Sequence, residues 1–447
     1  MRAYRGHLIH IGGSPRLDSA REHLVSVPDG VLVVNDAGSI AYSGSYQEMP
    51  AYPDTEMHDC RPGFLLPGFI DTHIHYPQTH CIDSYGGGQL LDWLQHCIFP
   101  AEAKLADRDY ARDVARDFCR RRVAVGTTTA LVFGSAFPDA QDTLFEESAR
   151  IGLRTISGRG IQTVGPEAAG PLLTDDDTAI ALTHSEIDRW HNAEGGLVKV
   201  AVVPRFALSV TGRTLHALGE LYDAVRGRGV YFHTHLSENV TEIDAVRTTY
   251  GVENYLDTYD GRFDGGGLSL LGPRSVFAHA VHCTDGELNR LSETGSSIAH
   301  CPTSQLFLGS GTMPWRRTVA SGVNVALGTD VSAGDEWLIP RVLNDCFKVH
   351  ISEPGGQGLS ISPAALLFTA TLAGARALQM EDRIGNLDVG KEADFVVIDP
   401  RCQPLLSELL TPIAPDDADR LLFTLLLSMR EDAVGGVYVR GRLLSPR

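Results

Sequence analysis

The sequence predicts an α/β protein in which a (β/α)8 barrel of the TIM type is inserted between two β-rich ends. Two observations indicate this fold. Short apolar strands alternate with helical stretches through the middle of the 447-residue chain, which is the spacing of repeated βα units. The segments on either side have strands and turns without such helices. A series of parallel strands covered by helices closes most naturally as an eight-stranded barrel.

The two ends carry the turn signals of a small sheet. Residues 29–44 are typical of two short β-branched strands joined by an Asn-Asp-Ala-Gly turn. Residues 385–399 and 436–444 have the same strand-and-turn character. We therefore expect the two ends to pair with each other beside the barrel.

The chain length agrees with two domains. At roughly 150 residues per domain the length suggests about three, but an α/β barrel can use more than about 250 residues as one unit. We predict a discontinuous small domain of residues 1–63 and 386–447, with the barrel formed by residues 64–385.

Each unit of the middle is recognised by a short apolar strand. Residues 110–122 and 215–228 carry helix patterns between such strands. Parallel strands with helices on the outside are therefore expected. The expected strands are residues 64–75, 126–133, 198–203, 229–235, 275–279, 297–300 and 323–330.

The composition is that of an acidic globular protein. Lys and Arg number 38 against 56 Asp and Glu, so the formal net charge is −18. The basic residues are scattered rather than gathered in a patch that would neutralise phosphates, so we expect no nucleic-acid partner. No apolar run reaches the roughly 18 residues that span a bilayer, and no signal-peptide stretch is found. The 8 cysteines have no C-x-x-C pair, unlike a disulfide framework or a structural zinc cluster. We expect a cytoplasmic protein with no membrane partner.

Several expected strands end in a polar side chain, at the place where a barrel carries its active site. His73 and His75 end the strand at 64–75, and residues i and i+2 of a strand face the same side. A lone H-x-H is weak evidence, because it also fits two ordinary polar residues near a strand end. His235, His279 and Asp330 occupy equivalent positions in the same series, which strengthens the functional interpretation.

Imidazoles with one carboxylate are the ligands expected for a catalytic Zn²⁺ or a similar ion. Such an ion lowers the pKa of bound water from about 15.7 to roughly 7 and so supplies hydroxide for hydrolysis. Glu238 follows His235 by three residues, where it can shuttle protons between water and substrate. In isolation it would instead be read as a solvated loop glutamate.

Four motifs together resemble the amidohydrolase superfamily, in its deaminase and chlorohydrolase branch. Within that branch, further segments are similar to the guanine deaminases: residues 75–78, 91–94, 99–102 and 204–209. Nearly the whole chain is covered. The four branch motifs are Pro67-Gly-Phe-Ile-Asp-Thr-His-Ile-His75, His233-Thr-His-Leu-Ser-Glu-Asn239, His300-Cys-Pro-Thr-Ser304 and Leu327-Gly-Thr-Asp330.

The resemblance implies a distorted barrel with a flanking β-sandwich and one zinc per subunit. His279 would orient the metal-bound hydroxide, which attacks C2 of guanine, while Glu238 protonates the adjacent ring nitrogen and ammonia leaves to give xanthine. Asp330 would also accept the proton of the water. The implied metal ligands are His73, His75, His235 and Asp330. The implied substrate contacts are His75, Gln78, Arg205, Phe206, His235, Glu238 and Asp330.

Two departures from the family pattern keep other substrates open. Gln305 stands where the family usually has Asn, and residues 157–166 lack a stretch expected in guanine deaminases. A hydrolase of the same branch acting on a pterin, a triazine or an adenosine derivative is the alternative. Iron or manganese also suits an N₃O ligand set, and members of the branch are commonly homodimers.

Two further hypotheses are less favoured. A catalytically inactive barrel scaffold would have lost a ligand or the proton shuttle, and none is lost. The other zinc-deaminase architecture needs H-x-E followed by Pro-Cys-x-x-Cys, and the sequence contains no Pro-Cys-x-x-Cys.

Overall fold

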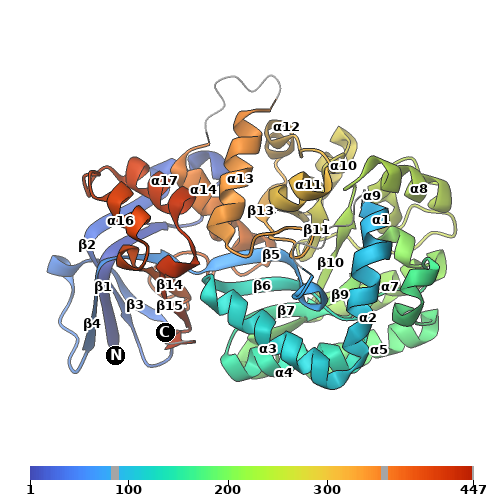
Figure 1. The fold of residues 1–447 in the computed structure, drawn as a ribbon, viewed down its shortest axis with the longest axis horizontal. Coiled ribbons are helices and arrows are strands. Elements are labelled where there is room, and N and C mark those ends of the chain that lie inside the picture. The colour runs from blue at the N-terminus through green and yellow to red at the C-terminus, as the bar shows by residue number, and fades with distance from the viewer. Residues whose placement is uncertain (82–89, 354–360, 445–447) are drawn as a thin grey trace. The chain divides into compact units, whose positions relative to one another are not determined.

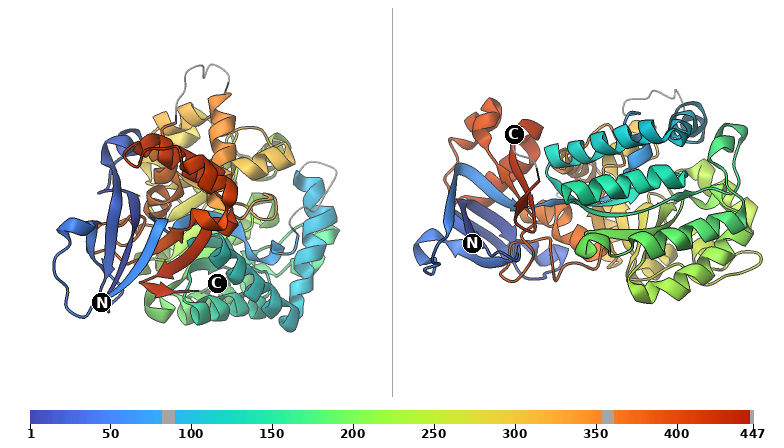
Figure 2. Two further views of the ribbon diagram at one scale, coloured as in Figure 1. Left: turned by 60° about the vertical axis from the view of Figure 1, so that its left-hand side comes forward. Right: turned by 90° about the horizontal axis from the view of Figure 1, so that it is seen from below.

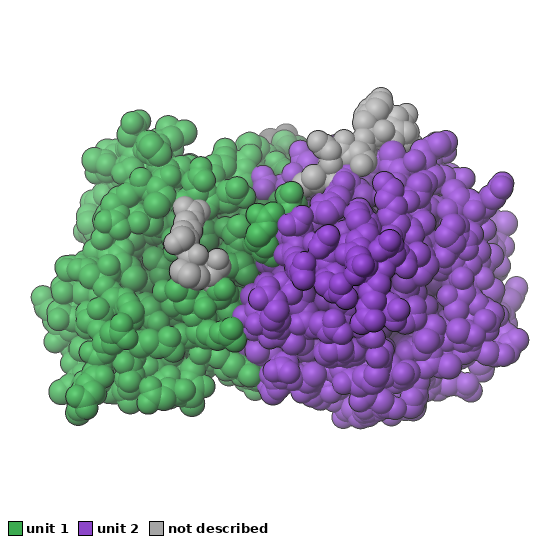
Figure 3. All heavy atoms as spheres, turned by 60° about the horizontal axis from the view of Figure 1, so that its bottom comes forward, with its two compact units in different colours: residues 1–71, 120–129, 337–447 green, residues 72–119, 130–336 purple. Residues whose placement is uncertain are grey.

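The computed structural model describes residues 1–81, 90–353 and 361–444. It separates into two compact units, shown in green and purple in Figure 3. Unit 1 comprises Met1–Asp71, Arg120–Thr129 and Trp337–Arg447, and unit 2 comprises Thr72–Cys119 and Ala130–Glu336. The domain limits expected from the sequence stay a prediction.

Unit 1 contains a mixed sheet built from both ends of the chain. Among the described residues, its strand order is β16-β15-β14-β4-β1-β2-β3, with β1 and β4 parallel and the other neighbouring pairs antiparallel. Tyr4 and Phe395 pack with ring centroids 4.9 Å apart, so the two ends share one apolar core. The strands are β1 (Arg2–Ile11), β2 (Leu24–Val34), β3 (Ile40–Ser45), β4 (Glu56–Pro67), β14 (Phe395–Ile398), β15 (Val434–Val439) and β16 (Arg442–Leu443).

The predicted Asn-Asp-Ala-Gly turn is confirmed, and it joins β2 to β3. Asn35 accepts the backbone N–H of Gly38 through its carbonyl at 3.0 Å and that of Ala37 through its side chain at 3.0 Å. Gly38 has a φ of 81°, a conformation that glycine adopts without a side-chain clash. The turn therefore depends on residues recognisable in the sequence.

The parallel strands form the expected barrel (Figure 1). In the described part of the chain eight strands follow one another in the order β13-β12-β11-β10-β9-β7-β6-β5, and β8 pairs with β9 beside them. The ring closes where the amide of Asp330 donates to the carbonyl of His73 at 2.9 Å and that of His75 to Val331 at 3.0 Å. The strands are β5 (Phe69–His75), β6 (Thr127–Phe133), β7 (Arg154–Gly158), β8 (Gly160–Ile161), β9 (Val198–Pro204), β10 (Tyr231–Leu236), β11 (Ser275–His279), β12 (Ser297–His300) and β13 (Asn324–Leu327).

Helices α4, α5 and α7 lie outside the strands of unit 2 (Figure 2). Their starts follow ordinary capping rules, because Asp175 and Thr211 accept the amides of Thr178 and Thr214 before α5 and α7. The helices within unit 2 are α1 (Leu90–Trp93), α2 (Phe99–Ala103), α4 (Pro138–Ile151), α5 (Asp176–Trp190), α6 (Ala193–Gly196), α7 (Gly212–Val225), α8 (Val240–Tyr250), α9 (Tyr255–Tyr259), α10 (Asp285–Glu293), α11 (Pro302–Leu308) and α12 (Trp315–Ala320).

Helix α3 (Arg108–Ala124) contains the helix predicted at residues 110–122. Within unit 1 the chain also forms α13 (Ile339–Ile351), α14 (Pro363–Ala370), α15 (Leu372–Ala377), α16 (Pro404–Leu410) and α17 (Ala418–Ser428). No helix in the described ranges is both long and apolar enough to cross a bilayer. The predicted fold class, a (β/α)8 barrel with a separate sheet from the two ends, is confirmed.

The prediction of one continuous strand over residues 64–75 is wrong. Residues 64–75 form two elements, because β4 ends at Pro67 and β5 begins at Phe69. Gly68 lies between them, and a Cβ there would overlap the side chain of Thr128. The continuous apolar run conceals this break, since both halves are buried.

Candidate active site

The side chains predicted to bind a metal converge at the carboxyl ends of the barrel strands. His73 and His75 end β5, His235 lies near the end of β10, and Asp330 follows β13. One ligand atom from each lies within 4.8 Å of all the others. One carboxylate oxygen of Asp330 is 3.0 Å from Nε2 of His73 and 3.2 Å from Nε2 of His75. The structure thus brings the predicted ligand set together.

Three hydrogen bonds fix which nitrogen of His73 and of His235 faces the cluster. His233 Nδ1 is 2.8 Å from the carbonyl of Val276 and donates to it, which leaves His233 Nε2 to accept from His73 Nδ1 at 2.8 Å. Nδ1 of His235 likewise donates to the carbonyl of Arg205 at 2.6 Å. The Nε2 atoms of His73 and His235 therefore present lone pairs to the cluster.

The cluster has the properties of a metal-binding site. Nε2 of His235 approaches Nε2 of His75 to 3.3 Å, and burial lowers the pKa of His75 to about 4 and that of His235 well below its usual value. Burial alone would raise the pKa of Asp330, but the interactions of its carboxylate with His73 and His75 outweigh burial, so the pKa is lowered. Neutral imidazoles and an ionised carboxylate are the protonation states that a divalent metal requires. The donor set therefore fits such an ion.

Glu238 and His279 lie beside the cluster. Nε2 of His279 is 3.4 Å from Glu238 and 3.7 Å from Asp330, and Ser310 donates to Glu238 at 3.3 Å. Burial, reinforced by Asp330 and Glu242, raises the pKa of Glu238 well above its usual value. A buried carboxyl that keeps its proton near neutral pH is a proton donor.

Unusual backbone conformations direct these side chains inward. Ser237, His279 and Asp330 have φ values of 47°, 72° and 52°, a left-handed region that residues other than glycine rarely adopt. Such strain gathers at functional sites, where the surrounding structure holds it. Here each strained residue is, or directly precedes, a side chain of the predicted site.

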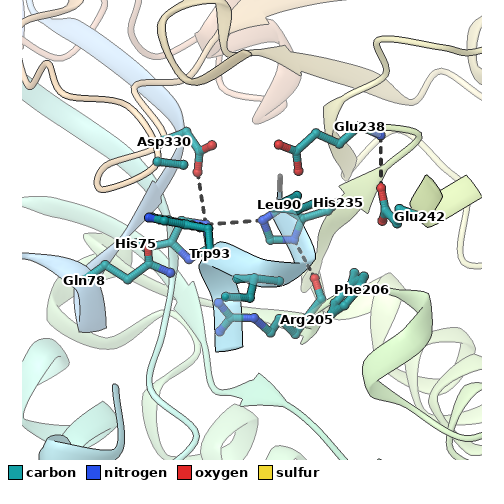
Figure 4. Close-up of a pocket in the computed structure, with 12 residues that line it drawn as sticks. His75, Gln78, Leu90, Trp93, Arg205, Phe206, His235, Glu238, Glu242 and Asp330 are labelled. Carbon is teal, nitrogen blue, oxygen red and sulfur yellow. Dashed lines mark hydrogen bonds and ion pairs between the residues drawn. The ribbon is translucent and has the colours of Figure 1, made fainter. Parts of the chain in front are cut away.

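A cavity of about 390 Å³ opens beside the cluster (Figure 4). We call it the reaction cavity. In Figure 4, Asp330 and Glu238 lie on one side of it and Gln78 and Arg205 on the other. Its lining residues are His75, Gln78, Leu90, Trp93, Leu94, Arg205, Phe206, His235, Glu238, Glu242, Asp330 and Ala333.

The predicted substrate contacts Gln78, Arg205 and Phe206 are all buried. Gln78 belongs to a 3₁₀ turn (Tyr76–Gln78) directly after β5, and the other two directly follow β9. The strand-to-loop junctions thus bring residues more than a hundred positions apart in sequence to one cavity.

Four polar residues near the site were not among the predicted site residues, although Glu102 and His233 lie within quoted motifs: Glu102, His233, Glu242 and Ser310. The H-x-H argument used for residues 73–75 applies equally to residues 233–235 and would have found His233. Glu242 accepts the backbone N–H groups of Glu238 and Asn239, each at 3.3 Å. It occupies the third position of α8, where a glutamate completes a capping box with Asn239.

Comparison with known proteins shows the family to which the chain belongs. Residues 64–444 match the model of the amidohydrolase family, and the chain belongs to that family. It is 41% identical to the probable guanine deaminase of Deinococcus radiodurans, covering 100% of this chain and 99% of that protein. It is 36% identical to the guanine deaminase of Escherichia coli, covering 100% and 98%. The crystal structure of guanine deaminase from Bradyrhizobium japonicum superposes with a TM-score of 0.90 at 31% identity, covering 100% and 99%. The predicted resemblance to guanine deaminases, and with it the prediction of an enzyme, is confirmed.

Proposed function

We propose that this enzyme is a zinc-dependent guanine deaminase that hydrolyses guanine to xanthine and ammonia. One observation carries the proposal most strongly: the metal-ligand cluster, Glu238 and the three purine contacts line or adjoin a single cavity. The full-length similarity to guanine deaminases supports the choice of substrate.

We propose that His73, His75, His235 and Asp330 hold the metal. A divalent ion in such a site acts as a Lewis acid and lowers the pKa of water. Zinc is the first choice for three imidazoles and a carboxylate, and iron or manganese fits the same ligands. Metal analysis of the purified enzyme distinguishes the three.

The protein's own groups would move the protons of the reaction. Asp330 accepts a proton from the attacking water, whose oxygen adds to C2 of the ring. Glu238 donates its proton to the ring nitrogen beside C2, then takes up the proton of the added hydroxyl as the carbonyl forms and passes it to the departing amino group, so that ammonia leaves. The proton held by Asp330 then returns Glu238 to its neutral form. His279 lies 3.4 Å from Glu238, a position from which it orients the attacking oxygen.

Gln78, Arg205 and Phe206 are proposed to hold the purine. Phe206 offers an apolar ring, and the other two offer hydrogen bonds that orient the base. His75, His235, Glu238 and Asp330 complete the contacts on the reacting side.

A second candidate is deamination or dechlorination of another heterocycle, such as a pterin, a triazine or an adenosine derivative. The observation that favours it is the departure at Gln305 and at residues 157–166. Gln305 is buried, and its amide nitrogen is 3.5 Å from Nδ1 of His300.

The decisive experiment is incubation of the metal-loaded enzyme with guanine, other aminopurines, pterins and triazines, with ammonia release as the readout. We expect guanine to give the highest kcat/KM. If guanine is inert while another ring reacts, the guanine assignment is wrong and the second candidate takes its place.

We also propose a cytoplasmic homodimer acting on a small purine. All eight cysteines lie in the described part of the chain and are free thiols, as in a reducing compartment. Light scattering tests the dimer, and cell fractionation tests the location.

A further inference from the structure

Helix α2 (Phe99–Ala103) holds a carboxylate against both polar substrate contacts. Glu102 is 4% exposed. One of its oxygens accepts from Arg205 Nη1 at 2.6 Å, and the other accepts from the amide nitrogen of Gln78 at 2.8 Å. Phe99, one turn earlier on the same helix, lies under the Arg205 guanidinium with its ring centroid 5.4 Å from Cζ, a cation–π distance.

The amide of Gln78 has only one orientation that satisfies its neighbours. Its oxygen accepts the backbone N–H of Ser332 at 3.2 Å and the Ser332 hydroxyl at 3.3 Å. Its nitrogen faces the carboxylate of Glu102. Rotating the amide by half a turn would place its oxygen against that carboxylate and its nitrogen against the Ser332 amide, so that neither contact could form.

This arrangement decides what Gln78 can offer a ligand. Both lone pairs of its oxygen are used by Ser332, and one of its two N–H groups is used by Glu102. A single N–H donor remains for the cavity. Arg205 has only donors by nature. The two side chains therefore present hydrogen-bond donors and no free acceptor.

We propose that Glu102 is a positioning residue that holds Gln78 and Arg205 so that they offer only hydrogen-bond donors to the reaction cavity, and we call this pair the donor-only wall. The wall would select rings that carry hydrogen-bond acceptors on the edge away from the reacting carbon, which is here called the far edge. The inference rests on the proposed function. With C2 of guanine facing Glu238, the far edge presents the oxygen on C6 and the nitrogen N7, and both accept hydrogen bonds. An amino group on C6 would instead place a donor against donors, and a buried mismatch of this kind is strongly rejected.

The test compares guanine with 2,6-diaminopurine, which differs by an amino group in place of the C6 oxygen. The variant Glu102→Gln keeps the size of the side chain and removes its charge. The matched control is Glu186→Gln, since Glu186 is also a buried glutamate of unit 2 and accepts the backbone N–H of Arg159 at 3.2 Å, but is absent from the residues that line the reaction cavity within the described chain. For each enzyme, kcat, KM, metal content and melting temperature are measured.

We expect Glu102→Gln to raise KM for guanine by about 10-fold or more and to reduce the guanine preference in kcat/KM by a similar factor. Its kcat should change by less than about 3-fold, because the reacting side is untouched. Glu186→Gln should keep the wild-type preference. A purely structural role for Glu102 would lower kcat/KM for both rings equally, and that result would overturn the inference.

If Glu102→Gln does not fold, the variant Ser332→Ala is measured in its place. It frees one lone pair of the Gln78 oxygen, so the relative kcat/KM for 2,6-diaminopurine should rise several-fold, and an unchanged ratio contradicts the donor-only wall. A wild-type enzyme that does not act on guanine refutes the proposed function and this inference together. A wild type that acts on guanine, with Glu102→Gln keeping full preference, refutes only the inference.

Discussion

Replacing Glu238 by Gln is expected to remove turnover while the metal stays bound. The substitution keeps the shape of a side chain that is 2% exposed and contacts His279 and Ser310. Its one chemical consequence is that the side chain can no longer release and recover a proton. Because the group is buried, bulk water has little access to take over the transfer.

The size of the effect follows from the role. General acid–base catalysis contributes about 10²–10⁴ in rate, so kcat should fall by that factor, which corresponds to about 2.7–5.4 kcal/mol of transition-state stabilisation. KM should change much less. Glu238 lies outside the four-residue ligand cluster, so metal content should equal that of the wild type.

The assay measures ammonia release at saturating guanine, with metal content determined on the same samples. Glu186→Gln serves as the matched control, because it removes a buried carboxyl away from the reaction cavity. His235→Asn is the contrasting variant and should lose metal and activity together. Undiminished kcat in Glu238→Gln would refute the reasoning, and a parallel loss of metal would show that the side chain acts on the ligands instead.

Three other outcomes are expected. Chelation should abolish activity, and adding back a single divalent metal should restore it; full activity in a metal-free sample would contradict the ligand assignment. Ser310→Ala, which removes the 3.3 Å hydrogen bond to Glu238, should lower kcat by about 3- to 30-fold, in line with a hydrogen bond of this kind, without changing metal content. Burial raises the pKa of Glu186 to about 8, whereas in the unfolded chain it is about 4.3. The folded state therefore holds a proton that the unfolded chain releases, and this stabilisation is present below about pH 4.3 and is lost as pH rises to about 8, by up to about 1.4 kcal/mol per pH unit. Denaturant unfolding of Glu186→Gln should lack this component, and equal pH slopes in both proteins would contradict it.

The parts of the fold that the sequence predicts well are those with local signals. The hairpin around Asn35 and Gly38 follows from turn residues, and the places of His75, His235 and His279 at or near the ends of strands follow from short apolar runs and side-chain alternation. These are properties of a few neighbouring residues, so no knowledge of the tertiary structure is needed.

The break at Gly68 and the contacts of Glu102 have no such local signal. Gly68 interrupts a continuous apolar run, and only the packing of Thr128 against it requires a residue without a side chain. Glu102 meets Arg205 across 103 positions. Its place in a segment that is similar to the guanine deaminases names no partner, and only the fold brings its carboxylate to Gln78 and Arg205.

The two departures from the family pattern lie outside the described lining of the reaction cavity. Among the described residues that line the reaction cavity, none is Gln305 and none comes from residues 157–166. Gln162, Val164, Gly165 and Pro166 instead line a neighbouring cavity, which shares Leu94 and Phe206 with the first. We therefore expect a change in that segment to act on a substituent of the ring or on the route by which the ring enters. The donors of Gln78 and Arg205 are fixed by Glu102 and Ser332, so the preference for an acceptor edge should persist even where the tolerance for larger ring substituents differs.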